Sequence, residues 1–275
     1  MYIKGMDGTA AETNWQERTG SKRTAALTAT DAQNIAEFES ASAAYKESYL
    51  GQLHRAVQEG AVIKASQSSE PLYRYAQEQL DLMRQKHPAW RDKNVDVYIH
   101  RDQARSPTNP DFEPLKDAAA TYPEMVQIGE SLLAHIMGND PTKLKALIAH
   151  EFGHSVNGDN LAAKTYAWLN APRNHQNEIL ANRMAAILFG NPKAFGEAYC
   201  SIGERGETAT HPSTQQMRMQ IARWAELLDQ QGVLDANGNV TDTEKALSIF
   251  EASKFTAMTE YSQRNQTGTP ILGKK

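Results

Sequence analysis

The chain has 275 residues, of which 40% are hydrophobic, and its net charge is −4 from 29 basic and 33 acidic side chains. This length and composition predict one domain, or one and a half, with a sizeable buried core. Basic residues form no long run and aromatic residues are not interleaved with them, which argues against a nucleic-acid-binding protein.

Cysteine content and apolar runs restrict the class further. The single cysteine, Cys200, excludes a disulfide framework, fits a reducing compartment, and is expected to be a small core residue on a helix. No apolar run is long enough to span a membrane, and residues 1–9 lack the apolar core of a secretion signal. We therefore expect a soluble protein without a membrane span, either cytoplasmic or exported without a recognisable signal peptide. The oligomeric state stays open.

The N-terminal third is expected to be helical after a disordered start. Residues 1–29 are polar and predict a disordered segment, and the tail 266–275 is expected to be mobile. Residues 30–90 are expected to form a helical part packed on a core that spans 91–265. Apolar residues at helical spacing predict one long helix over 30–65 and another over 70–87.

The middle of the chain predicts a small sheet. Residues 95–99 alternate as a strand does, and 125–128 form a second strand. Residues 101–122 contain three prolines and are expected to form a long loop. The strand at 125–128 is predicted either to lie at the sheet edge, where a substrate peptide can pair with it, or to be an ordinary inner strand.

Everything after residue 140 predicts helix, apart from a turn at 235–238. The expected helices cover 141–157, 159–171, 174–189, 192–203, 213–231 and 242–263. The predicted fold class is therefore α+β, mostly α-helical, with a small β-sheet.

The first of these helices contains a metal-binding motif, H-E-x-x-H, at His150, Glu151 and His154. Residues four apart lie on one face of a helix, so both histidines can hold one metal ion. Glu151 points to the edge of that site, where it can reach a water on the metal. This pattern is typical of zinc-assisted hydrolysis of a peptide bond.

The surrounding residues support a buried, rigid motif helix. Asp140 and Pro141 are a good helix start, with a carboxylate at the N-cap and proline at the first helical position. The apolar residues Leu144, Ile148 and Phe152 form a stripe beside the histidines.

A third ligand is expected from the helix predicted at 174–189. Catalytic zinc normally takes three protein ligands, and Glu178 is the favoured candidate. His175 is the rival, because it is only three residues away. Asn182 lies on the same helix face as Glu178 and can hydrogen-bond a ligand histidine. Asn160 stands where the longer motif H-E-x-x-H-x-x-G-x-x-H needs its last histidine, which argues against that motif.

A third block, T-H-P-S-T followed by Arg218, adds two candidate catalytic side chains. Ser213 or Thr214 can cap the next helix, which places His211 on a stiff loop and Arg218 about one turn into the helix. A histidine and an arginine facing a zinc-bound carbonyl can stabilise an oxyanion. His211 can instead occupy the open position of zinc and hold the site closed.

These three blocks in order resemble the HtpX and CAAX-prenyl-endopeptidase superfamily of zinc metallopeptidases, over residues 90–230. The resemblance implies a gluzincin-type core with one zinc ion per chain, held by His150, His154 and Glu178. It also implies that Glu151 is the general base and that His211 and Arg218 belong to the active-site wall. The family usually has aspartate where this chain has Asn182, so the orientation of a ligand histidine is expected to differ.

The motifs leave two functions open. The first is a soluble zinc-dependent endopeptidase that acts on a polypeptide substrate with a zinc-activated water. The second is a non-hydrolytic protein-binding module that retains a vestigial or blocked zinc-peptidase fold. The presence of Glu151 favours the enzyme, because a binding module needs no base.

Overall fold

A computed structural model describes residues 50–102, 115, 119–122, 125–157, 173–207 and 211–266. Residues 50–58 are helical. The elements that follow are β1 (Val62–Lys64), a short 3-10 turn (Ala65–Gln67), α3 (Pro71–Lys86), β2 (Asp96–His100), β3 (Ala119–Tyr122), β4 (Met125–Gly129), α4 (Glu130–Asn139), α5 (Pro141–Asn157), α7 (Arg173–Phe189), α8 (Pro192–Cys200), α9 (Thr214–Gln230) and α10 (Thr243–Gln266).

The four strands form one mixed sheet in the order β1-β2-β4-β3. The central pair, β2 and β4, is parallel, with Val97 opposite Val126. The outer strands are antiparallel to their neighbours, with Ile63 opposite Ile99 in β1 and β2 and Thr121 opposite Val126 in β3 and β4. In the sheet that the described residues form, β1 and β3 are therefore the edges.

The sheet buries an apolar face against helices. Alternate residues of the central strands, among them Val97, Ile99, Val126 and Ile128, join the main hydrophobic core. This core is shared with α3 and α5, which pack on that face. The opposite face carries a smaller apolar cluster in which Leu53 from the helical residues 50–58 packs near Met125.

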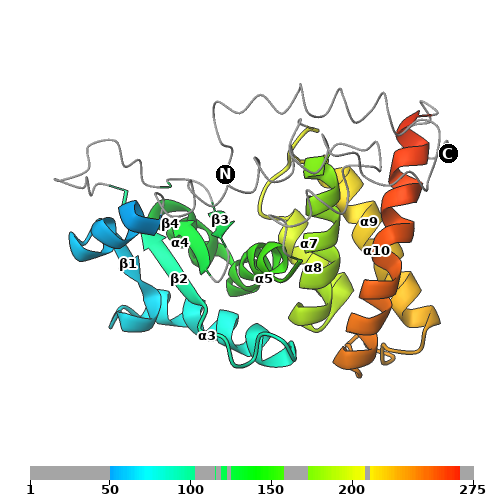
Figure 1. Ribbon diagram of the computed structural model, residues 1–275, viewed down its shortest axis with the longest axis horizontal. Coiled ribbons are helices and arrows are strands. Elements are labelled where there is room, and N and C mark those ends of the chain that lie inside the picture. The colour runs from blue at the N-terminus through cyan, green and yellow to red at the C-terminus, as the bar shows by residue number, and fades with distance from the viewer. Residues whose placement is uncertain are drawn as a thin grey trace, which may run out of the picture.

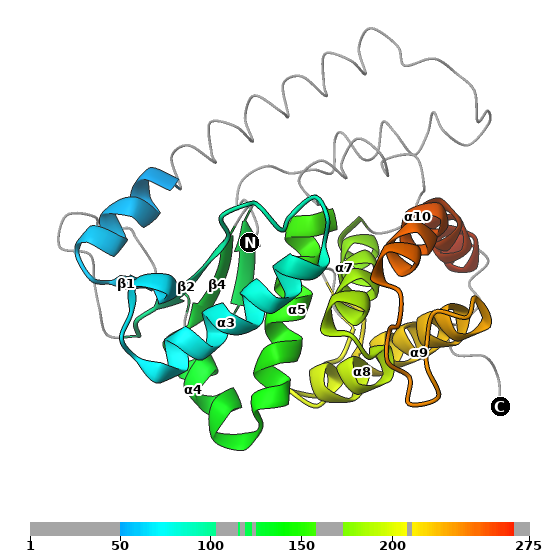
Figure 2. The same ribbon diagram turned by 90° about the horizontal axis from the view of Figure 1, so that it is seen from below.

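α5 lies between the sheet and the helices of the second half. It contacts β3 and β4 on one side and α7 and α8 on the other. Figures 1 and 2 show this arrangement: the sheet with α3 and α4 lies at one end, and α7 to α10 gather at the other. The helix that carries the H-E-x-x-H motif is thus fixed from both sides.

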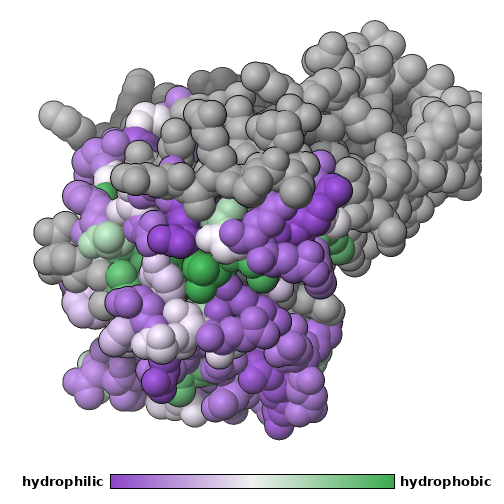
Figure 3. All heavy atoms as spheres, turned by 90° about the vertical axis from the view of Figure 1, so that its left-hand side faces the viewer, coloured by the Kyte–Doolittle hydropathy of each residue, from purple (hydrophilic) through white to green (hydrophobic). Residues whose placement is uncertain are grey.

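The described residues expose few large apolar side chains. Within the described ranges, Leu82 is the one exposed large hydrophobic side chain, at 53%. The face shown in Figure 3 is largely hydrophilic, with apolar side chains in small patches. No helix built from the described residues is both long and apolar enough to cross a membrane.

The N-terminal helix prediction is wrong at its end. Residues 62–64 form β1, although the prediction extended the helix to 65. Gly60 has φ 74°, its N–H donates to the carbonyl of Val57, and the N–H of Ala61 donates to the carbonyl of Ala56. This is the hydrogen-bond pattern of a helix that ends at a glycine with left-handed backbone. The chain then leaves the helix, and the β-branched residues that follow pair with β2 as strand β1.

The loop predicted over 101–122 is wrong at its last four residues, which form the edge strand β3. Of the two alternatives for 125–128, the ordinary inner strand is confirmed, because β4 is paired on both sides, by β2 and by β3. α4 was not predicted. The predicted disordered start at 1–29, the helix at 159–171 and most of the C-terminal tail fall outside the described residues.

Within the described residues, the other helix, strand and turn predictions hold within a few residues, whereas residues 30–49 of the predicted long helix lie outside them. α3, α5, α7, α9 and α10 occupy the predicted helices, and the turn at 235–238 lies inside the bridge between Leu234 and Val240. α8 ends at Cys200, three residues before the predicted end at 203, and Cys200 is a free, buried cysteine as expected. The α+β class with a small sheet is confirmed.

Candidate metal centre

α5 begins as its sequence predicts. The side chain of Asp140 accepts a hydrogen bond from the N–H of Thr142 at 2.8 Å, which caps the helix. Leu144, Ile148 and Phe152 are fully buried. The helix is therefore anchored over its length by its cap and by its apolar stripe.

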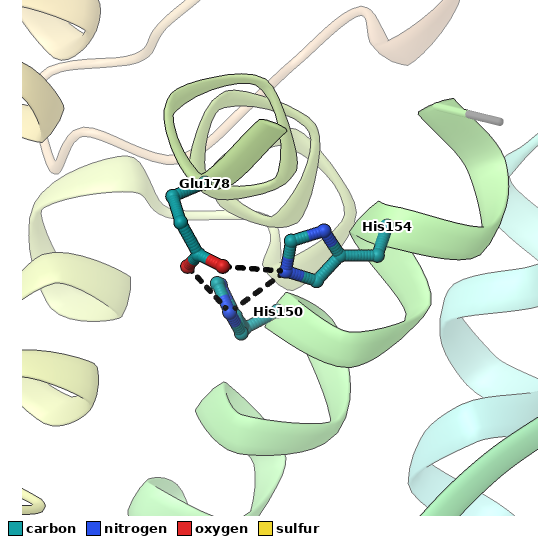
Figure 4. A group of neighbouring side chains, drawn as sticks. All are labelled: His150, His154 and Glu178. Atoms are coloured by element: carbon teal, nitrogen blue, oxygen red, sulfur yellow. Dashed lines mark hydrogen bonds and ion pairs between the residues drawn. The ribbon is translucent and has the colours of Figure 1, made fainter. Parts of the chain in front are cut away.

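α7 brings the third predicted ligand to the two histidines. It packs closely along α5, and its N-terminal half carries Glu178 over the histidine face. Figure 4 shows the three side chains pointing at one another, His150 and His154 from α5 and Glu178 from α7. His150 and Glu178 are buried, and 10% of the His154 side chain is exposed.

The donor atoms of these three residues lie close enough to share one metal ion. The Nε2 atoms of the two histidines are 3.1 Å apart. Oε2 of Glu178 lies 3.3 Å from His150 Nε2, and Oε1 of Glu178 lies 3.4 Å from His154 Nε2. One ligand atom from each residue lies within 4.8 Å of the other two, so the group could hold a metal ion.

The Glu178 carboxylate has the properties of a metal ligand. Its Oε2 atom is buried and has no hydrogen-bond partner among the described residues. Burial raises the pKa of Glu178, but the neighbouring His154 and His150 outweigh burial and hold that pKa well below its ordinary value. A buried, ionised oxygen without a donor is costly unless a cation occupies the site.

A side chain on α7 selects the tautomer of His150. Asn182 Oδ1 lies 3.0 Å from His150 Nδ1, so this nitrogen carries the proton and donates it to the amide oxygen. Nε2 of His150 is then left with the lone pair that faces Glu178 and His154. The predicted hydrogen bond between Asn182 and a ligand histidine is thus present. The other amide atom, Nδ2, is buried and has no partner among the described residues.

Glu151 lies next to the ligands in a buried position. It is 8% exposed. Burial raises the pKa of its carboxyl above the ordinary value, while His150 and His154 act in the opposite direction. A carboxylate whose pKa is moved upward beside a metal site suits a general base that must take up a proton and release it again.

His211 reaches the same cluster from the loop before α9. Its Nε2 lies 3.4 Å from a carboxylate oxygen of Glu178, and its side chain is 39% exposed. Ser213 caps α9 in a capping box with Gln216, which fixes the path of this loop. Burial lowers the pKa of His211, and the charge of Glu178 opposes this shift.

Arg218 makes its contacts with other groups. Its guanidinium lies 2.8 Å from a Glu204 carboxylate oxygen and donates to the carbonyl of Cys200 at 3.3 Å. The arginine whose charge acts on His211 is Arg205, which is held by two hydrogen bonds with Thr214. A place for Arg218 in the active-site wall stays a prediction, and no local pattern in the sequence singled out Arg205.

The choice between His175 and Glu178 is decided by position. His175 is buried, and its ring lies 3.8 Å from a carboxylate oxygen of Glu207. The group of described residues whose atoms converge contains Glu178 and not His175. Glu178 is therefore the third ligand that the geometry supports.

The aromatic residue Tyr199 also belongs to the centre and was not found from the sequence. Its ring stacks on His150 with ring centroids 4.4 Å apart and the planes 25° apart. Tyr199 comes from α8, and only the packing of α8 against α5 and α7 places it there.

Comparisons with models of known protein families, with curated proteins and with solved structures give no match. The metal centre is therefore interpreted from its own residues.

Proposed function

We propose that this chain is a zinc-dependent endopeptidase. The observation that carries the proposal is the convergence of His150, His154 and Glu178, with Glu151 buried beside them. Two imidazole nitrogens and one carboxylate oxygen are a donor set of hydrolytic zinc sites, which take three protein ligands and leave one position open. The motif blocks that resemble the HtpX and CAAX-prenyl-endopeptidase superfamily point to the same activity.

Each residue of the centre has a separate role in the proposed hydrolysis. His150, His154 and Glu178 would hold the zinc ion, which would supply a Lewis acid that activates a water for attack. Glu151 accepts the proton of the attacking water and delivers it to the nitrogen of the leaving amine. The His211 ring donates a hydrogen bond to the carbonyl oxygen as that oxygen becomes negative. Water adds across the peptide bond, which leaves one new carboxyl group and one new amine.

A substrate chain is proposed to bind along β3. This strand is the edge of the described sheet on the side of α5, and its inner edge pairs with β4. An extended peptide added to such an edge is held by main-chain hydrogen bonds, with little selection among side chains. We therefore expect unfolded polypeptides as substrates. The strand at 125–128, for which peptide pairing was one of two alternatives, is paired on both sides and cannot take this role.

A non-hydrolytic binding module is the second candidate, and Asn182 is the observation that favours it. A neutral amide in place of a carboxylate raises the basicity of the ligand histidine less, and its Nδ2 atom has no partner among the described residues. Glu151 argues for the enzyme, since a binding module has no use for a buried base.

One assay separates the two. The zinc-loaded chain is incubated with a reduced, alkylated, unfolded protein in water enriched in oxygen-18, and the products are analysed by mass spectrometry. The enzyme gives internal cleavages, each with one heavy oxygen in the new carboxyl group, and a chelator abolishes them. An unfolded protein that binds and stays intact would identify the binding module.

A further inference from the structure

Two different contacts hold the His150 ring, one in the ring plane and one on the ring face. Asn182 accepts a hydrogen bond from Nδ1 in the plane at 3.0 Å. Tyr199 stacks on the face at 4.4 Å, 25° from parallel. The hydrogen bond alone leaves the imidazole ring free to rotate about the line from Nδ1 to Oδ1. A second ring stacked on the imidazole face resists that rotation.

The direction of the His150 ring decides whether the centre is assembled. His154 meets His150 edge to face, with planes 84° apart and centroids 4.6 Å apart. In this orientation both Nε2 atoms lie close to the Glu178 carboxylate, at 3.3 Å for His150 and 3.4 Å for His154. A tilt of the His150 ring would move Nε2 away from the other two ligand atoms.

Tyr199 is itself held in place by a column of aromatic rings. Phe195, one turn earlier on α8, is fully buried and stacks on Tyr199 at 5.5 Å with planes 9° apart. Phe189 at the end of α7 packs against Phe195 at 5.9 Å. The side chain of Asn191 accepts a hydrogen bond from the N–H of Ala194 and caps α8, which fixes the helix that carries the column.

The Tyr199 side chain adds no charge to the centre. It is 8% exposed, and burial raises the pKa of Tyr199 well above its ordinary value, with the charges of Glu178 and Glu151 acting in the same direction. A neutral aromatic ring can support a ligand histidine without competing for the metal.

We propose that Tyr199 is a positioning residue of the metal centre, whose ring holds the His150 imidazole with Nε2 directed at Glu178 and His154. This inference rests on the proposed function only in requiring that the centre binds zinc. The ring, rather than the hydroxyl, carries the role, because the stacked contact is with the ring.

Two substitutions at Tyr199 separate the ring from the hydroxyl. Tyr199→Phe keeps the stacked ring, so its zinc affinity is expected to stay at the wild-type level. Tyr199→Leu removes the stack and is expected to weaken zinc binding by about 10–100-fold, the usual effect of losing a group that orients a ligand. Affinities are measured on the whole chain by competition with a chromophoric chelator.

Phe189→Leu is the matched control, because it truncates a ring of the same column that is not in contact with His150. It is expected to lower thermal stability and to leave zinc affinity unchanged. A fall in zinc affinity as large as that of Tyr199→Leu would overturn the proposal, because the effect would then be one of general packing.

Nuclear magnetic resonance of the metal-free chain gives a second readout that needs no activity. The ring current of a stacked aromatic shifts the His150 ring protons upfield in the wild type and in Tyr199→Phe, and Tyr199→Leu is expected to lose that shift. Wild-type protein that binds no zinc would contradict the proposed function. Wild-type protein that binds zinc only as tightly as Tyr199→Leu would contradict the role of Tyr199 alone.

Discussion

The backbone of Ala181 on α7 occupies the space where any side chain at position 153 of α5 would lie. A Cβ built on Gly153 would collide with the Ala181 carbonyl oxygen, well inside the 3.0 Å that real Cβ atoms keep from other heavy atoms. Gly153 is the second of the two unspecified residues in the H-E-x-x-H motif. Its missing side chain lets α7 approach α5 and so brings Glu178 within reach of the two histidines.

Gly153→Ala is expected to force the two helices apart and to weaken the metal centre with them. Overpacking against a fixed backbone costs roughly 1–3 kcal/mol of unfolding free energy. Zinc affinity should fall as well, because Glu178 moves with α7. Both quantities are measured on the same preparation, by urea unfolding and by chelator competition.

The control for this change is Gly196→Ala on α8. A Cβ there would lie 2.9 Å from Cγ2 of Ile221, a side-chain atom that can shift more easily than a backbone carbonyl. Gly196→Ala is expected to cost less stability and to leave zinc affinity at the wild-type level. If both alanine variants lost zinc equally, the close approach at Gly153 would not be what positions Glu178.

The metal stoichiometry is expected to be one zinc per chain. Glu178→Ala removes one of the three converging ligands, so elemental analysis after dialysis should show most of the zinc lost. His175→Ala should retain it, because His175 is not among those ligands. Full retention in Glu178→Ala, together with loss in His175→Ala, would move the third ligand to His175.

The motif helix and its partner were predictable because their evidence is local. An i, i+4 pair of histidines, an aspartate-proline start and an apolar stripe are all readable within α5, and Glu178 and Asn182 share one face of α7. The spacing of residues along a helix fixes which side chains meet on one face. This is why the ligands and the hydrogen bond that His150 donates to Asn182 could be expected before the structure.

Contacts between distant elements could not be predicted in this way. Tyr199 contacts His150 because α8 packs against α5. Position 153 requires glycine because the carbonyl oxygen of Ala181 on α7 lies where a Cβ would be. The edge strands β1 and β3 are three and four residues long, too short for a reliable alternation pattern. Gly60 is a glycine of the kind that ends helices, and the prediction of one helix over 30–65 did not take it into account.

His211→Ala is expected to lower the rate of peptide cleavage by about 10²-fold, as for the loss of one oxyanion donor, with zinc content unchanged. The physical reason is the position of its Nε2 atom, 3.4 Å from a carboxylate oxygen of the ligand Glu178, where the ring could reach a substrate carbonyl at the metal. A rate that rises instead would show that His211 holds the free protein closed. A variant with unaltered rate and unaltered zinc affinity would place His211 outside the site.

A buried histidine in the sheet is expected to make stability depend on pH. Burial lowers the pKa of His100 to about 4, and its neutral ring donates to the Gln127 side chain through Nε2 and accepts from the N–H of Leu115 through Nδ1. Since the unfolded chain has the ordinary value of about 6.5, the folded chain binds fewer protons below that pH. Its stability is therefore fully present above about pH 6.5 and is lost as the pH falls toward 4.

The loss is expected to reach about 3 kcal/mol of unfolding free energy between about pH 7.5 and pH 4. Urea unfolding of the metal-free chain at several pH values gives the slope. His100→Gln keeps a polar side chain that does not titrate, so the difference between wild type and variant should shrink as the pH falls. A difference that is the same at all pH values would show that His100 does not titrate as its burial requires.

The most direct test of the central claim is the rate of cleavage of an unfolded protein by zinc-loaded wild type and by zinc-loaded Glu151→Gln. The substitution keeps the shape of the side chain and leaves the three ligands in place, so both proteins should contain equal zinc. The loss of the base is expected to lower the rate on the order of 10²–10⁴-fold. Equal rates in the two proteins would contradict the account, because cleavage would then proceed without the base that the centre is proposed to use.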